Sequence, residues 1–173
     1  TVIAAVTGGC DSIEHGTFLN DEAIRLLAQK RTALVPTVYL PTHYLERKKQ
    51  FAFDDSTWNF FGRLKARNQE NLKKARNRGV WIVAGSDAVA GMHGYNAREI
   101  VRLSSAGLKP AEAIRAATID AAELVGLKGQ TGEIRQGLLA DIIAVPGNPL
   151  NDINNLEQVA FVMKSGKVFK SNL

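Results

Sequence analysis

The stretch that decides the fold is Val80-Trp81-Ile82-Val83-Ala84-Gly85-Ser86-Asp87. Five consecutive apolar residues without a polar interruption are typical of a strand that is buried on both faces, as in a parallel sheet covered by helices. Gly85 and Ser86 end the run, and the carboxylate of Asp87 follows. We therefore predict a buried parallel strand over residues 80–84 with an acidic residue at its carboxyl end.

The rest of the chain alternates short apolar runs with helical patterns, which favours an α/β fold of parallel strands joined by crossover helices. Residues 39–55 are predicted to be one long loop, of the kind that commonly forms a lid or a binding loop. The other predicted elements are strands over 10–14 and 32–38 (ending at Pro36), a helix capped by Asn20 or Asp21, and helices over 56–78, 96–105, 110–117 and 119–125.

After residue 127 the pattern changes to short strands separated by glycine and proline turns. This predicts a small β unit over 128–173, appended to an α/β unit over 1–127. Ser165-Gly166 is expected to form a tight hairpin turn between the last two strands. The predicted strands cover 133–134, 140–145, 159–164 and 167–170.

Composition and charge exclude several classes of protein. The 173 residues are 45% hydrophobic and carry a net charge of +5. No run approaches the roughly 20 apolar residues of a membrane span, and the N-terminus lacks a signal peptide's basic flank, so we expect no membrane contact and a cytoplasmic location. The positive charge is concentrated in residues 45–80, where a solvated helix face explains it better than a nucleic-acid patch. The single cysteine, Cys10, is expected to be a buried hydrophobe rather than a nucleophile.

Two polar residues stand at the ends of predicted apolar strands: His15 directly after residues 10–14, and Asp87 after Gly85-Ser86. Because the carboxyl ends of parallel strands share one edge of the sheet, both residues would face the same rim. Imidazole and carboxylate suit zinc and similar divalent metals. A structural alternative stays open for each residue: His15 as a hydrogen-bonded structural histidine, and Asp87 as a turn or cap residue.

Six short motifs, taken together and in this order, resemble the C-terminal half of the metal-dependent amidohydrolase superfamily. The nearest branch is the imidazolonepropionase-like and Xaa-Pro dipeptidase (prolidase-like) one. The motifs lie at residues 9–16 (Gly-Cys-Asp-Ser-Ile-Glu-His-Gly), 33–37 (Ala-Leu-Val-Pro-Thr), 85–87 (Gly-Ser-Asp), 93–99 (His-Gly-Tyr-Asn-Ala-Arg-Glu), 113–118 (Ala-Ile-Arg-Ala-Ala-Thr) and 132–143 (from Gly-Glu-Ile to Ala-Asp-Ile-Ile).

The resemblance implies a fold and a set of site residues. Residues 1–127 would be the C-terminal part of a TIM (β/α)8 barrel, about strands six to eight. Residues 128–173 would be part of a small composite β-sandwich. His15 looks like the metal ligand that ends the sixth strand, and Asp87 looks like the metal ligand and general acid/base that ends the eighth.

Three further residues are implied to contact substrate: Tyr39, His93 and Asn96. For Tyr39 the alternative is an aromatic side chain that packs on the barrel. For His93 and Asn96 it is a hydrogen bond that orders the loop. The third histidine, His43, matches no motif of the family and is expected to be exposed.

The implied activity is hydrolysis of an amide or peptide bond in a dipeptide or other small molecule. It would use water activated by one or two divalent metal ions, zinc first among them. The family also needs a His-x-His pair and two further ligands from earlier strands, none of which can be placed here, so the isolated chain is expected to be inactive. Its expected partner is the missing N-terminal half of the barrel, with homo-oligomerisation left open. A cyclic-amide hydrolase such as an imidazolonepropionase and a non-catalytic binding or assembly module are the alternatives.

Overall fold

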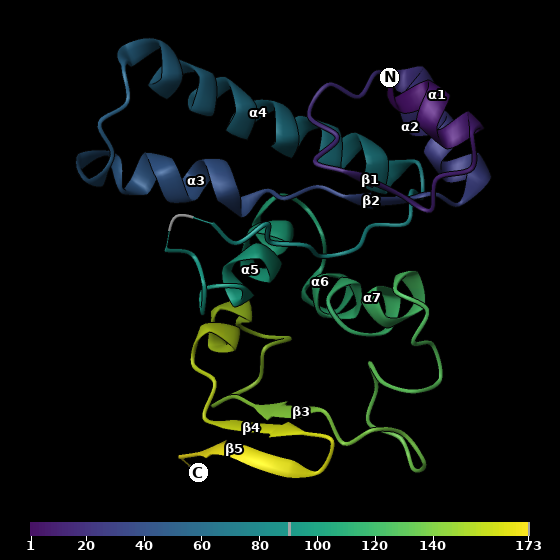
Figure 1. Cartoon of the computed structure of the whole chain (residues 1–173), viewed down its shortest axis with the longest axis vertical. Coiled ribbons are helices and arrows are strands. Elements are labelled where there is room, and N and C mark those ends of the chain that lie inside the picture. Colours follow the sequence, from purple (N-terminus) through teal and green to yellow (C-terminus); the bar gives the residue numbers. More distant parts are fainter. Residues whose placement is uncertain (90, 173) are drawn as a thin grey trace.

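Three parallel segments lie side by side in the N-terminal part of the chain, as the computed structural model of residues 1–89 and 91–172 shows (Figure 1). Strand β1 (Ser12–Glu14) pairs with β2 (Ala33–Val35), with Ile13 opposite Leu34. On the other side of β2, Leu34 forms a parallel bridge with Ile82. Two of the three predicted parallel strands are therefore confirmed over shorter ranges, and the third, predicted over 80–84, is only a single parallel bridge at Ile82.

Helices cover these strands, and the predicted ones are present with bounds that differ by no more than one residue. The Asn20 side chain caps its helix, since Oδ1 accepts a hydrogen bond of 2.8 Å from the Ala23 N–H. The helices are α1 (Val2–Thr7), α2 (Asp21–Lys30), α4 (Asp55–Asn77), α5 (Ala97–Ser105), α6 (Pro110–Ala116) and α7 (Ile119–Leu124).

The prediction of one long loop over 39–55 is wrong. The segment contains helix α3 (Tyr39–Glu46) and a short 3-10 helix, η1 (Lys48–Gln50). Pro41 is compatible with the helix because it lies in the first turn, where backbone N–H groups have no partner within the helix. In Figure 1, α3 runs alongside the start of α4, away from the strands.

Aromatic rings join this pair of helices and bury His43. Tyr44 stacks on Phe61 of α4 with ring centroids 4.7 Å apart, and it meets Phe51 at 4.9 Å. The His43 ring lies between Tyr39 and Tyr44, with centroid distances of 5.8 and 5.7 Å. His43 is only 1% exposed, so the expectation of an exposed histidine is wrong.

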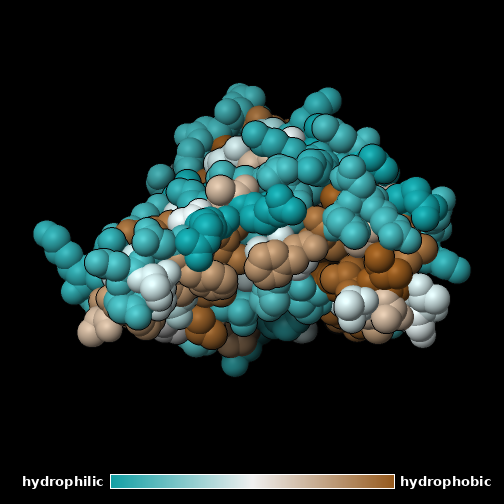
Figure 2. Space-filling view, turned by 90° about the horizontal axis from the view of Figure 1, so that it is seen from above, coloured by the Kyte–Doolittle hydropathy of each residue, from teal (hydrophilic) through white to brown (hydrophobic). Residues whose placement is uncertain are grey.

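The basic segment forms a solvated helix face, as expected. Leu72 and Ala75 of α4 are buried, whereas lysines and arginines such as Arg67, Lys73 and Lys74 are exposed. Figure 2, seen from the end of the molecule where α1, α2 and α4 lie, is mostly hydrophilic, with apolar areas along its lower edge. Among the described residues, no helix is both long and apolar enough to cross a bilayer.

The core forms on both faces of β2, because successive side chains of a strand point to opposite sides. Leu34 packs with Ile24 and Leu27 of α2 in one cluster. Ala33 and Val35 pack with Val83 in another. Cys10 precedes β1 and is exposed, so the expectation that it is buried is wrong.

The C-terminal β unit is an antiparallel sheet in the order β3 (Ile142–Ala144), β4 (Phe161–Lys164), β5 (Lys167–Ser171). The hairpin at Ser165-Gly166 is confirmed. The strand predicted over 133–134 is wrong, because these residues lie in a turn-rich stretch. A 3-10 helix, η2 (Ile153–Glu157), packs against α5. Figure 1 shows this sheet at the opposite end of the molecule from α1 and α2.

We expect Gly16→Ala to destabilise the protein more than Gly79→Ala. Both glycines have left-handed backbones, with φ of 58° and 72°. That conformation costs an alanine about 1–2 kcal/mol. A Cβ at Gly16 would also lie 2.6 Å from the buried Leu34 Cδ1, and such overpacking adds about 1–3 kcal/mol. Urea denaturation measures both losses, and equal values would contradict the close packing at Gly16.

Candidate active site at the carboxyl ends of the strands

Each of the three parallel segments is followed by a non-glycine residue with a left-handed backbone. These residues are His15 after β1, Thr37 after β2 and Asp87 after the segment around Ile82, with φ of 65°, 50° and 44°. Such conformations are uncommon outside glycine, and each costs roughly 1–3 kcal/mol. Strained residues of this kind cluster at active sites and ligand clamps. The carboxyl edge of the parallel strands is therefore the candidate site.

His15 is exposed and is held through its backbone and through the turn that follows it. Its N–H donates a 2.7 Å hydrogen bond to the Val35 carbonyl, which extends the pairing of β1 and β2 by one residue. Asn71 of α4 donates Nδ2 hydrogen bonds to the carbonyl oxygens of Gly16 (3.3 Å) and Thr17 (2.7 Å). The backbone around His15 is thus fixed while the imidazole stays at the surface.

Asp87 is also exposed, and the residue before it is tied to the loop that precedes α5. The Asn96 Nδ2 donates a 3.0 Å hydrogen bond to the Ser86 Oγ. Asn96 therefore makes the loop-ordering contact that was the alternative to substrate binding, and its side chain remains exposed. His93 is exposed in the same loop. The structure places both residues on the same loop beside the end of the third strand segment.

Tyr39 begins α3 and is completely buried. Its hydroxyl oxygen accepts hydrogen bonds from the Nη1 atoms of Arg98 (2.9 Å) and Arg47 (3.4 Å). The ring of Tyr95 lies against both guanidinium groups, 4.7 Å from Arg98 and 5.7 Å from Arg47. The hydrogen bond that Arg98 donates to the Tyr39 hydroxyl oxygen is the leading reason why the pKa of Arg98 is raised. Tyr39 thus packs within the protein and supports two partly exposed arginines.

Glu99 of α5 is a residue of this region that the sequence analysis did not single out. Its side chain is 1% exposed, and its carboxylate accepts hydrogen bonds from the N–H groups of Val38 (2.9 Å) and Tyr39 (2.7 Å). Burial raises the pKa of Glu99 to about 7, against the opposing effect of these two bonds. An acidic residue in the first turn of a helix is common, which hid this burial in the sequence. Asn71 could have been noticed, because it falls on the apolar stripe of α4 beside Leu72.

His15 and Asp87 have the donor types that zinc prefers, but they are only two. The described residues contain no group of three or more His, Cys, Asp or Glu side chains that could hold a metal ion. Zinc sites in proteins ordinarily use three or four protein ligands. His15 and Asp87 are therefore of the donor types that a metal site uses, but they are fewer than a complete site needs.

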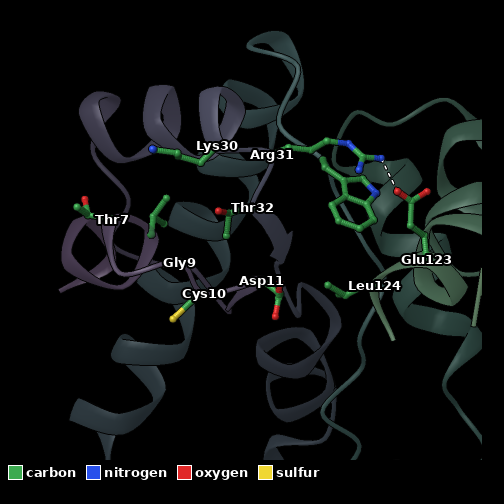
Figure 3. A pocket seen from close by; sticks show the side chains of 11 residues that line it. Thr7, Gly9, Cys10, Asp11, Lys30, Arg31, Thr32, Glu123 and Leu124 are labelled. Atoms are coloured by element: carbon green, nitrogen blue, oxygen red, sulfur yellow. Dashed lines mark hydrogen bonds and ion pairs between the residues drawn. The ribbon is translucent and has the colours of Figure 1, made fainter. Parts of the chain in front are cut away.

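A pocket of about 450 Å³ lies at the other end of the strands. Its lining includes Cys10, Asp11 and Thr32, which precede β1 and β2 in the chain (Figure 3). Across it, Arg31 pairs with Glu123 at 2.6 Å and stacks 4.8 Å from the Trp81 ring. Because ligands of parallel α/β folds bind at the carboxyl ends of strands, we assign the candidate site to the rim with His15 and Asp87 and not to this pocket.

The fold, and the rim that carries His15 and Asp87, place the chain among α/β proteins whose active sites lie at the carboxyl ends of parallel strands. Within that class the chain belongs to the amidohydrolase family, whose model matches residues 2–169. Ochratoxinase of Aspergillus niger is 33% identical over 98% of this chain and 36% of its own length. An uncharacterized protein of Mycobacterium tuberculosis is 31% identical over 95% of this chain and 44% of its own length.

Solved structures agree with this assignment. A Xaa-Pro dipeptidase with methionine bound in its active site is 34% identical and superposes with a TM-score of 0.88 over 98% of this chain. A prolidase in complex with N-methylphosphonate-L-proline is 30% identical, with the same TM-score and coverage. This chain covers 42% of each of the two structures, so it spans less than half the length of the relatives that it matches.

We expect Glu99 to make stability depend on pH. Because its pKa is raised in the folded state, to about 7 from 4.5, its stabilising effect is complete below pH about 4.5 and is lost as the pH rises through 7. The loss corresponds to about 3 kcal/mol. Glu99→Gln removes this titration, so the free energies of unfolding of wild type and variant should converge or cross between pH 4.5 and 7. A constant difference between them in urea denaturation over that range would contradict the raised pKa.

Proposed function

We propose that this chain supplies His15 and Asp87 to the active site of a metal-dependent amidohydrolase that cleaves an amide or peptide bond. The observation that carries the proposal is the pair of left-handed, exposed residues at the same edge of the strands, on the two segments that flank β2. A dipeptide is the first candidate substrate, on the strength of the similarity to a Xaa-Pro dipeptidase and a prolidase.

We further propose that the chain is one part of a larger catalytic unit. Residues 1–127 would provide the strands corresponding to the sixth to eighth of a TIM barrel, and residues 128–173 would provide part of the flanking β-sandwich. The coverage of 36–44% of the relatives' length supports the proposal that the chain is one part of a larger unit. The remaining metal ligands would then come from the other part, and the chain alone would be inactive.

A non-catalytic binding or assembly module is the second candidate. The observation in its favour is that the described residues contain no complete group of metal ligands. The strained conformations of His15 and Asp87 weigh against it, because a module without chemistry has no need of imidazole and carboxylate side chains at those positions.

In the proposed reaction, His15 and Asp87 would hold a divalent cation, with zinc as the first candidate. When bound, such an ion supplies a Lewis acid and lowers the pKa of water. Asp87 would accept the proton of the attacking water and return it to the nitrogen of the leaving amine, as general base and then general acid. The hydrogen bond between the side chains of Asn96 and Ser86 would help to hold the loop that carries the Asp87 carboxylate for both transfers.

Substrate contacts are proposed for Tyr39, His93 and Asn96. His93 and Asn96 are exposed in the loop after Asp87 and could reach a ligand at the rim directly. The Tyr39 side chain is completely buried, so its direct contact would need a local rearrangement. Otherwise Tyr39 would act through the arginines that it holds.

In the complete enzyme, we expect Asp87→Asn to lower kcat by about 10³-fold, since the amide cannot transfer the proton. His15→Asn should also deplete the bound metal, measured by elemental analysis of the purified protein. Asp55→Asn, an exposed aspartate at the start of α4, is the matched control and should change neither quantity. Near-normal turnover by Asp87→Asn with its metal retained would refute the assignment.

For residues 1–173 on their own, we expect no tight, stoichiometric zinc binding and no amide hydrolysis. Two candidate ligands are fewer than the three or four that zinc ordinarily takes from a protein. Isothermal titration with zinc, followed by desalting and metal analysis, tests this expectation. One equivalent of zinc retained by the chain would contradict the proposal that the site is completed by other residues.

A further inference from the structure

The carboxylate of Glu99 forms its hydrogen bonds with the backbone of another element. Both of its oxygens accept N–H groups of the segment that follows β2: Oε1 from Val38 and Oε2 from Tyr39, at 2.9 and 2.7 Å. The two partners lie 61 and 60 residues away in the chain. Burying a carboxyl group is costly, so a buried one in this place needs a compensating role.

The segment held by Glu99 is strained and has no cap of its own. Thr37 has φ of 50°, which is unfavourable for a β-branched residue. Val38 is the N-cap residue of α3, and its side chain makes no capping hydrogen bond. The side chain of Glu99, a residue of α5, caps the helix instead, and it thereby fixes the turn between β2 and α3.

Tyr39 connects the backbone that Glu99 holds with two positively charged side chains. Its hydroxyl oxygen accepts a hydrogen bond of 2.9 Å from Arg98 and one of 3.4 Å from Arg47. Arg98 also pairs with Glu157 at 2.9 Å, and Arg47 lies 3.9 Å from Glu46. The arginine side chains are 26% and 22% exposed, so they can still meet a ligand.

A guanidinium group has five N–H donors, and its geometry matches a carboxylate. The two arginines lie beside the exposed ring of Tyr95, which belongs to the same loop as His93 and Asn96. A ligand at this loop would therefore find two guanidinium groups whose positions depend on Tyr39.

We propose that Glu99 is a positioning residue, which fixes Tyr39 and, through the Tyr39 hydroxyl, two arginines that bind a carboxylate group of the substrate. The inference rests on the proposed function, because it needs a substrate that binds at this rim. Beyond the proposed function, it assigns a role to the buried Glu99. It also predicts that one end of the substrate carries a carboxylate group.

The test compares two forms of one substrate in the complete enzyme: a dipeptide with a free carboxylate and the same dipeptide as its C-terminal amide. Glu99→Gln replaces one carboxylate oxygen by an amide NH2, so one of the two backbone hydrogen bonds is lost. We expect KM for the free dipeptide to rise about tenfold, the effect of one hydrogen bond. KM for the amide should rise less, and kcat should stay within about twofold.

Glu112→Gln is the matched control. Glu112 also accepts a backbone N–H at the start of a helix, that of Lys109 at 2.7 Å, and it pairs with Arg76. Its substitution should lower stability without changing the ratio of the two KM values. Tyr39→Phe, which removes the hydroxyl but keeps the ring, should reproduce the selective rise in KM.

Amide hydrogen exchange of residues 1–173 gives a readout that does not depend on activity. In Glu99→Gln, the exchange of the Val38 and Tyr39 amides should accelerate more than that of the Lys109 amide, and in Glu112→Gln the order should be reversed. Exchange of Val38 and Tyr39 unchanged in Glu99→Gln would overturn the positioning role.

The inference and the proposed function fail in different ways. If Asp87→Asn abolishes turnover but Glu99→Gln raises KM equally for the free and amidated dipeptides, the positioning role is wrong and the proposed function stands. If Asp87→Asn retains turnover, the proposed function is wrong. A complete enzyme that hydrolyses no amide overturns both.

Discussion

Leu34 is the residue through which the three parallel segments are joined. It is opposite Ile13 on one side and Ile82 on the other. Its N–H donates to the Trp81 carbonyl at 2.8 Å, and its carbonyl accepts from the Val83 N–H at 3.0 Å. With Leu34 only 1% exposed, these backbone bonds are protected from water and the order of the segments is fixed. Everything proposed about the rim depends on this order, because it places His15 and Asp87 at one edge.

Side chains of α4, of α5 and of the loop before α5 form hydrogen bonds with residues of the rim. Asn71 of α4 binds the carbonyl groups after His15, Glu99 of α5 binds the N–H groups after Thr37, and Asn96 binds Ser86. Each of these contacts falls within two residues of a left-handed position. Each of the three strand ends is therefore held by at least one side-chain hydrogen bond from a residue distant in the sequence or on the following loop.

The strands and most helices could be predicted because their signals are local: an uninterrupted apolar run, an Asn cap, a glycine that ends a helix. Helix α3 was missed because Pro41 and several aromatic residues obscured a short helix whose stability comes from packing on α4. For the same reason His43 was placed at the surface. The contacts of Glu99 and Asn71 join residues more than 50 positions apart, and no local pattern in one sequence reveals them. The positions of His15 and Asp87 beyond the parallel segments could be predicted from the apolar runs that precede them, and their role as metal ligands stays a prediction.

The left-handed residues at the rim mark positions at which the sequence is not optimised for stability. At His15, Thr37 and Asp87 glycine would adopt the same backbone without strain, so a sequence selected only to fold well would carry glycine there. The amino ends of the strands carry the Arg31 contacts with Glu123 and the Trp81 ring, which add cohesion. Arg31 also has a left-handed backbone, with φ of 54°, but it is the C-cap of α2, where that conformation is common. Stability and chemistry thus occupy opposite ends of the same short strands. Substitutions intended to make the protein more robust can therefore be directed to one end and leave the other untouched.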